Sequence, residues 1–144
     1  MREGRLVFSG RVVPGRSRGR ELGFPTANLK VVGVNQLPRG VYVARINGAA
    51  PEPCWSVANI GYRPTFGGHE LAVEVHILDF TGDLYERDIE VVLKKKLRGE
   101  KAFAGSDELV AQICTDIQQA RALIADLWVG AQLSNTEIKD VDNH

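Results

Sequence analysis

Two side chains with neutral oxygen donors, Thr26 and Asn28, follow Pro25 at a spacing of two. Pro25 fixes its own φ and pushes Phe24 toward an extended conformation. On an extended backbone, residues two apart point to the same face, so the hydroxyl and the carboxamide would lie side by side. A hard cation such as Mg²⁺, itself held by nucleotide phosphates, accepts such a partial shell of oxygen ligands. The alternative is that the Thr-x-Asn pair caps a turn.

The segment just upstream, residues 15–23, contains three glycines and three arginines. Glycine allows a ligand to approach the backbone closely, and arginine favours phosphate. Alone, a segment of this composition is typical of a solvated turn. Together with Thr26 and Asn28, it indicates a site for a Mg-nucleotide.

A single carboxylate, Glu74, lies in the alternating segment 71–78. On a strand, Glu74 shares one face with His76, while the apolar residues on either side of Glu74 share the other. Without further information this pattern favours a solvent-facing strand residue, because carboxylates are seldom buried.

The elements that must position these residues are strands, followed by one helix. Six segments separated by Gly, Pro and polar turns predict strands over residues 6–13, 26–32, 40–46, 54–60, 71–80 and 89–97. Because no helical period lies between them, we expect an antiparallel sheet that closes on itself rather than βαβ units. From Ser106 an apolar residue recurs every three or four positions, which predicts one amphipathic helix over 107–128.

Composition narrows the class of protein. The 144 residues fit one domain, which we place at 1–128, with a polar C-terminal tail at 129–144 that is expected to fray. The 18 basic and 18 acidic residues cancel, which argues against a general binder of nucleic acid or membrane surfaces. No apolar run approaches a membrane-spanning length. Two cysteines, Cys54 and Cys114, are typical of reduced thiols, so we expect a cytoplasmic protein. We also expect a monomer.

Four blocks resemble the riboflavin kinases, whose opening motif has the form G…GR.LGFPTANL. The blocks occur in the family's order and near its spacings between about Phe8 and Leu127, and they are residues 15–29, 59–66 (NIGYRPTF), 73–80 (VEVHILDF) and 97–103 (LRGEKAF). The resemblance implies a six-stranded Greek-key barrel with a C-terminal helix. It also implies transfer of the γ-phosphoryl group of Mg-ATP to the 5′-hydroxyl of riboflavin, giving FMN and ADP, with Zn²⁺ or Mn²⁺ as alternative metals.

The same resemblance implies roles for individual residues. Glu74 falls on the family's catalytic glutamate, the general base that accepts the proton of the riboflavin hydroxyl, and His76 is expected to support the site without acting in it. Thr26 and Asn28 take the magnesium role. The nucleotide contacts fall on Gly15, Arg20, Thr26, Ile77, Asp79 and Tyr85. The flavin contacts fall on Arg98, Lys101 and Phe103.

The sequence also departs from the family. Glu86 stands where the family commonly has a glycine after its tyrosine, so a position that needs φ > 0 would be strained or would take a different turn. The adenylyltransferase domain usual in bacterial members leaves no signature here, so both a stand-alone kinase and the kinase module of a longer protein remain open.

Two other functions are weighed against the kinase. One is a non-catalytic flavin- or nucleotide-binding module of the same fold. The other is a nucleic-acid-binding barrel using the basic run 94–98, which the scarcity of aromatic residues near that run disfavours.

Overall fold

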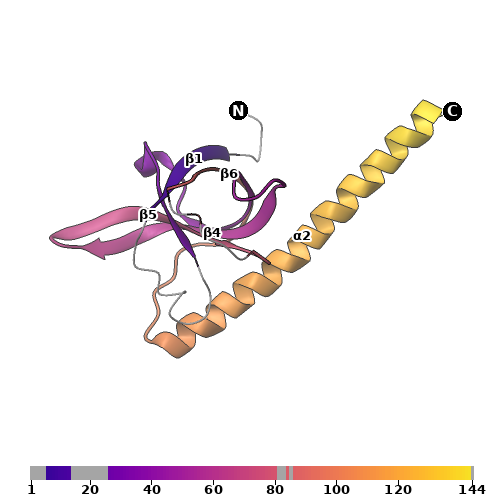
Figure 1. The fold of residues 1–144 in the computed structure, drawn as a ribbon. Coiled ribbons are helices and arrows are strands. Elements are labelled where there is room, and N and C mark those ends of the chain that lie inside the picture. The colour runs from indigo at the N-terminus through magenta and orange to yellow at the C-terminus, as the bar shows by residue number, and fades with distance from the viewer. Residues whose placement is uncertain (1–5, 14–25, 81–83, 85, 144) are drawn as a thin grey trace.

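The computed structural model describes residues 6–13, 26–80, 84 and 86–143 (Figure 1). The strands are β1 (Leu6–Val13), β2 (Ala27–Lys30), β3 (Gly40–Asn47), β4 (Cys54–Thr65), β5 (Gly68–Ile77) and β6 (Asp88–Arg98). A short 3-10 turn, η1 (Val34–Gln36), lies between β2 and β3, and helix α2 (Ser106–Asn143) follows the last strand.

The six strands form a closed barrel in the order β1-β2-β5-β4-β3-β6. Every pairing is antiparallel. Strands β3, β4 and β5 form a meander, and β2 lies beside β5, which is the arrangement of a Greek key. Strand β1 closes the barrel between β2 and β6. The predicted fold, a closed antiparallel barrel of six strands with one C-terminal helix, is confirmed.

The barrel interior is apolar because alternate residues of each strand point inward. Along β5, Val73 and Val75 are 1% and 0% exposed and belong to the core, whereas Glu74 between them is only partly buried. Ile60 of β4 lies opposite Val73 and is also fully buried. Complete burial of one such aliphatic side chain contributes about 1.5–3 kcal/mol. The interior therefore supplies the stability of the fold.

The β4–β5 hairpin is longer than predicted. Beyond Ile60, β4 pairs with β5 alone, as far as Thr65 opposite Gly68, and the hairpin projects from the barrel (Figure 1). The predicted strand ended at residue 60, before Gly61 and Pro64, but proline is tolerated on a strand edge that needs no N–H donor. Gly67, with φ 90°, provides the turn. Strand β5 ends at Ile77. The prediction that the strand continues through residues 78–80 is therefore wrong.

Helix α2 begins at Ser106, close to the predicted start, but continues to Asn143. The segment expected to fray as a polar tail is therefore helical, and its far half extends away from the barrel (Figure 1). After Gly130, neither proline nor glycine interrupts the helix. The first half packs against β3, β4 and β6, with Ala120 fully buried. Within the described ranges, no helix combines the length and apolarity needed to cross a membrane.

Candidate active site

Glu74 lies on the outer face of the barrel, at the centre of three paired strands. In the ladder it stands opposite Asn28 of β2 on one side and Asn59 of β4 on the other. Directly opposed residues of antiparallel strands share a face, so a carboxamide flanks the carboxylate on each side. The hydroxyl of Thr26, just before β2, donates a hydrogen bond to Glu74 Oε1 at 3.1 Å. The fold thus brings together three candidates that are up to 48 residues apart.

The oxygen donors of Thr26 and Asn28, beside the carboxylate of Glu74, fit a hard cation. The side chain of Asn28 is held in a defined place, since the residue is 6% exposed. A hydroxyl that donates its proton to a carboxylate still has oxygen lone pairs to offer a cation. In the part of the chain that the structure describes, no group of three or more His, Cys, Asp or Glu residues could hold a metal. The neutral oxygen donors of Thr26 and Asn28 fit a partial shell that substrate phosphates would complete.

A pocket of about 150 Å³ lies between this face of the barrel and helix α2. Its floor comes from β3, β4 and β5, and its far wall is the apolar stripe of the helix. The lining residues are Thr26, Val41, Val57, Asn59, Glu74, His76, Arg98, Phe103, Leu109, Ile113, Asp116 and Ile117. A second hollow of about 130 Å³ adjoins it and also contains Glu74, Arg98 and Phe103, together with Lys101. The predicted base and the predicted flavin contacts therefore meet in one place.

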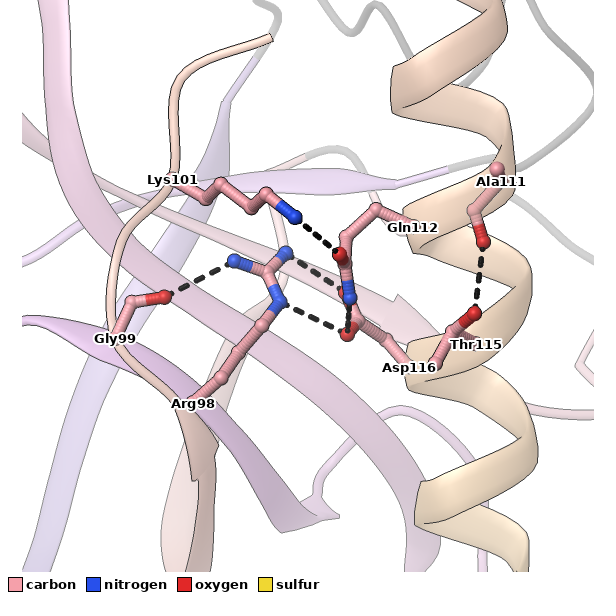
Figure 2. A network of polar contacts seen from close by, with 7 residues as sticks. All are labelled: Arg98, Gly99, Lys101, Ala111, Gln112, Thr115 and Asp116. Carbon is pink, nitrogen blue, oxygen red and sulfur yellow. Dashed lines mark hydrogen bonds and ion pairs between the residues drawn. The ribbon is translucent and has the colours of Figure 1, made fainter.

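Two of the predicted flavin residues, Arg98 and Lys101, form polar contacts with side chains of helix α2 (Figure 2). Arg98, the last residue of β6, forms a two-point ion pair with Asp116, from Nε to Oδ1 at 2.9 Å and from Nη2 to Oδ2 at 2.8 Å. Its guanidinium carbon lies 6.0 Å from the centre of the Phe103 ring. Lys101 Nζ donates to the side chain of Gln112 at 3.2 Å. The cations expected to face the flavin thus also join the barrel to the helix.

The loop after β6 is attached to β4 beside the pocket. The carboxylate of Glu100 accepts a hydrogen bond from the backbone N–H of Tyr62 at 2.9 Å and forms an ion pair with Arg39 at 3.4 Å. A Cβ at Gly61 would collide with this carboxylate. A larger residue at position 61 would therefore force the Glu100 side chain to move and would disturb its hydrogen bond to the Tyr62 N–H.

The predicted nucleotide residues do not all line the pocket that contains Glu74 and the flavin contacts. Ile77 is 7% exposed and packs in the barrel core, so a nucleotide would meet its backbone rather than its side chain. Asp79, with φ 57°, forms a two-point ion pair with Arg121 of α2 at 2.9 and 3.0 Å. The hydrogen bond and charge of Arg121 lower the pKa of the Asp79 carboxyl below its usual value. Gly15, Arg20 and Tyr85 lie outside the described residues.

Glu86 adopts φ 65°, so the position where the family commonly has glycine does take a left-handed conformation in this chain. The strain expected from the sequence is present, and for a non-glycine residue it costs about 1–2 kcal/mol. The turn is held by hydrogen bonds between the Glu86 N–H and the Val12 carbonyl at 2.8 Å, and between the Arg87 N–H and the Leu84 carbonyl at 3.0 Å.

Sequence reasoning missed the residues that α2 contributes to the site. Asp116 lies three positions after Ile113 and four before Ala120, so a carboxylate interrupts the apolar stripe. A charge on the buried face of an amphipathic helix is a signal that could have been used, because such a charge needs a partner. Asn59 belongs to the block 59–66 that resembles the family, but its place opposite Glu74 follows only from the strand register.

Together the fold and the pocket define a small Greek-key barrel domain with a candidate ligand site on its outer wall, beside a C-terminal helix. The riboflavin kinase family, Flavokinase, matches residues 3–124. This chain therefore belongs to the riboflavin kinase family.

Relatives support the same conclusion. The chain is 50% identical over 116 residues to the bifunctional riboflavin kinase/FMN adenylyltransferase of Escherichia coli K12, covering 81% of this chain and 37% of that protein. It is 44% identical over 120 residues to the protein of the same name from Pseudomonas fluorescens, covering 82% and 38%. The chain thus spans well under half the length of these relatives.

Solved structures resemble it as well. A Streptococcus pneumoniae structure described as a macrolide-efflux protein superposes with a TM-score of 0.72 at 35% identity, covering 81% of this chain and 38% of that one. Riboflavin kinase from Trypanosoma brucei gives a TM-score of 0.60 at 25% identity, covering 84% and 78%.

Proposed function

We propose that this chain is a riboflavin kinase domain, which transfers the γ-phosphoryl group of ATP to the 5′-hydroxyl of riboflavin and yields FMN and ADP. One observation carries the proposal. Glu74, bonded to the Thr26 hydroxyl at 3.1 Å and flanked by Asn28, lines the same pocket as Arg98 and Phe103. This transfer needs a base for the hydroxyl proton and oxygen ligands for the metal. It also needs a surface for the flavin, which an aromatic ring with a neighbouring cation provides.

In the proposed reaction, the riboflavin 5′-oxygen attacks the γ-phosphorus of ATP, and the bond from that phosphorus to the β,γ-bridging oxygen breaks. The hydroxyl proton passes to the carboxylate of Glu74. The hydrogen bond from Thr26 orients that carboxylate, and the rigid strand β5 holds it in place. Because phosphoryl transfer involves little covalent chemistry by the protein, positioning and charge stabilisation supply most of the acceleration.

The flavin half of the proposed site consists of Phe103, Arg98 and Lys101. Phe103 offers a planar apolar surface to the isoalloxazine ring, and the two cations offer donors to the ring carbonyls or the product phosphate. Leu109 and Ile113 of α2 cover this side of the pocket with apolar atoms, which limits the access of water to the reacting groups.

Mg²⁺ is the proposed metal, held by Thr26 and Asn28, with Zn²⁺ or Mn²⁺ as alternatives. When bound, the ion would neutralise charge on the transferring phosphates. The free thiols of Cys54 and Cys114 support action in the reducing environment of the cytoplasm. The proposed small-molecule partners are riboflavin and ATP, and the proposed oligomeric state is a monomer.

The test is to incubate the purified protein with riboflavin, ATP and Mg²⁺ and to separate FMN from riboflavin by chromatography. Glu74→Gln serves as the matched control because it keeps the shape of the side chain. We expect FMN in proportion to ADP from the wild-type protein and far less from the variant. Riboflavin binding without FMN would overturn the kinase and favour the non-catalytic binding module.

A further inference from the structure

Asp116 is a buried carboxylate with defined partners and no role among the contacts predicted from the sequence. Its side chain is 5% exposed. Oδ1 accepts hydrogen bonds from Arg98 Nε at 2.9 Å and from Gln112 Nε2 at 2.9 Å, and Oδ2 accepts one from Arg98 Nη2 at 2.8 Å. A carboxylate buried to this degree is stable only when it is paired in this way.

These contacts hold the Arg98 side chain in one orientation. Nη1 donates to the Gly99 carbonyl at 3.0 Å, so the guanidinium is held both by the helix and by its own loop. A guanidinium carries five N–H groups in a rigid planar fork. The described contacts use three of them, one each on Nε, Nη1 and Nη2, so one N–H on Nη1 and one on Nη2 are left for a ligand. Asp116 thus determines which way the donors of Arg98 point.

The network continues from Asp116 to Lys101 (Figure 2). The amide of Gln112 donates through Nε2 to Asp116 and accepts through Oε1 from Lys101 Nζ at 3.2 Å. The acceptor Asp116 therefore sets the orientation of the Gln112 amide, and that orientation presents an oxygen to Lys101. One carboxylate thus orients both cations of the proposed flavin half, Arg98 directly and Lys101 through Gln112.

A second two-point ion pair between α2 and the barrel provides an internal comparison. Arg121 and Asp79 bond at 2.9 and 3.0 Å, with side chains 50% and 76% exposed. Neither residue lines the pocket under α2. This pair therefore attaches the helix without touching the flavin half, whereas the Arg98–Asp116 pair does both.

We propose that Asp116 is a positioning residue for flavin binding, and the proposal rests on the proposed function. Through Arg98 and Gln112, it places the donors and the neighbouring Phe103 ring where the isoalloxazine ring binds. Helix α2 then contributes to flavin binding, because its Asp116 side chain orients Arg98 directly and Lys101 through Gln112.

The experiment compares Asp116→Asn with Arg121→Gln, which removes the other ion pair of the same helix. Riboflavin affinity is measured by the change in flavin fluorescence, ADP affinity by calorimetry, and turnover by FMN formation. For Asp116→Asn we expect the riboflavin Kd and KM to rise at least ~10-fold, while kcat and the ADP Kd change less than ~3-fold. Arg121→Gln should leave the riboflavin Kd unchanged. Wild-type flavin affinity in folded Asp116→Asn, or an equal loss in Arg121→Gln, overturns the proposal.

Gln112→Met keeps the proposal testable if Asp116→Asn does not fold, because it leaves the Arg98–Asp116 pair in place. Loss of this link to Lys101 should raise the riboflavin Kd about threefold, and an unchanged Kd in this variant also overturns the proposal. Wild-type turnover tests the kinase separately. If the wild type binds riboflavin but makes no FMN, the kinase fails while the binding comparison still decides the role of Asp116. If the wild type does not bind riboflavin, both proposals fail.

Discussion

The two faces of strand β5 differ in what they contribute to the molecule. Val73 and Val75 point inward and are almost completely buried in an apolar core. Glu74 and His76 point outward and line the pocket beneath α2. The inner face is covered by the opposite strands, whereas the outer face lines a pocket whose far wall is helix α2. Because successive side chains alternate between these faces, one strand can supply stability and chemistry with little interference between them.

This difference teaches that stability and activity should be separable by substitution. On the inner face, the loss of a side chain leaves a cavity among well-packed neighbours. On the outer face, the exchange of one polar group for another of the same shape leaves the packing unchanged and alters only the chemistry. The predictions below start from the largest expected effect.

The largest effect is expected for Glu74→Gln on the outer face. Positioned proton transfer contributes about 10²–10⁴-fold to rate, with phosphoryl transfer near the low end because its loose transition state requires less deprotonation of the nucleophile. We therefore expect kcat to fall at least ~100-fold, while the melting temperature and the dissociation constants of riboflavin and ADP change little. Single-turnover FMN formation measures the rate. Unfolding or loss of flavin binding would instead make Glu74 a structural or ligand-binding residue.

Ile60→Ala tests the inner face. Ile60 is fully buried opposite Val73, so truncation removes apolar contacts and leaves a cavity. The free energy of unfolding should fall by about 2–5 kcal/mol, measured by urea denaturation, while kcat of the remaining folded protein stays near the wild-type value. A large fall in kcat at a temperature where the variant is fully folded would show that the two faces are coupled.

Asn28→Ala tests whether the metal side and the flavin side of Glu74 can be separated on the outer face. If Asn28 contributes to the metal shell, nucleotide use at limiting Mg²⁺ should weaken on the order of tenfold, the equivalent of about 1.4 kcal/mol. The riboflavin Kd should hardly change, because the proposed flavin contacts lie on the other side of Glu74. Titration of turnover against Mg²⁺ gives the measurement, with Asn59→Ala as the matched variant on the opposite side of Glu74. Near-wild-type turnover of Asn28→Ala at limiting Mg²⁺ would remove Asn28 from the metal shell.

The smallest effect is expected for Arg121→Gln, which lies on neither face. Arg121 lowers the pKa of Asp79, so the stabilisation from this pair is present above the unfolded pKa of about 4 and is lost as the pH falls through the lower folded value. At neutral pH and low salt, the variant should melt slightly below the wild type. The difference should close in acid and in high salt, because the pair is exposed. A difference that persists in acid would contradict the assignment of this effect to the ion pair.

The sequence predicted the strands and the start of the helix well because these depend on local alternation and period. Strand β1 was predicted to the residue, whereas the β4–β5 hairpin was not, since tolerance of Pro64 depends on which strand edge is left without a partner. The helix end was missed because polar composition does not prevent helix formation in 129–143.

For the site, local pattern indicated Thr26 and Asn28, but their approach to Glu74 depends on the pairing of β2 with β5. The catalytic role of Glu74 and the flavin contacts were predicted from the resemblance to a family and not from the residue pattern alone. The partners of Arg98 and Lys101 could not be predicted, because they depend on how α2 is rotated and placed on the barrel.

The pairing of β1 with β6 has a consequence for how the chain folds. Leu6 lies opposite Leu93, so the last seam of the barrel joins segments from the two ends of the domain. Such high contact order predicts slow folding, on the scale of milliseconds to seconds. Until β6 arrives, β1 and β3 each present an unpaired edge to solvent. A nascent or transiently opened molecule is then exposed to strand exchange with its neighbours, and closure of this one seam is what ends that exposure.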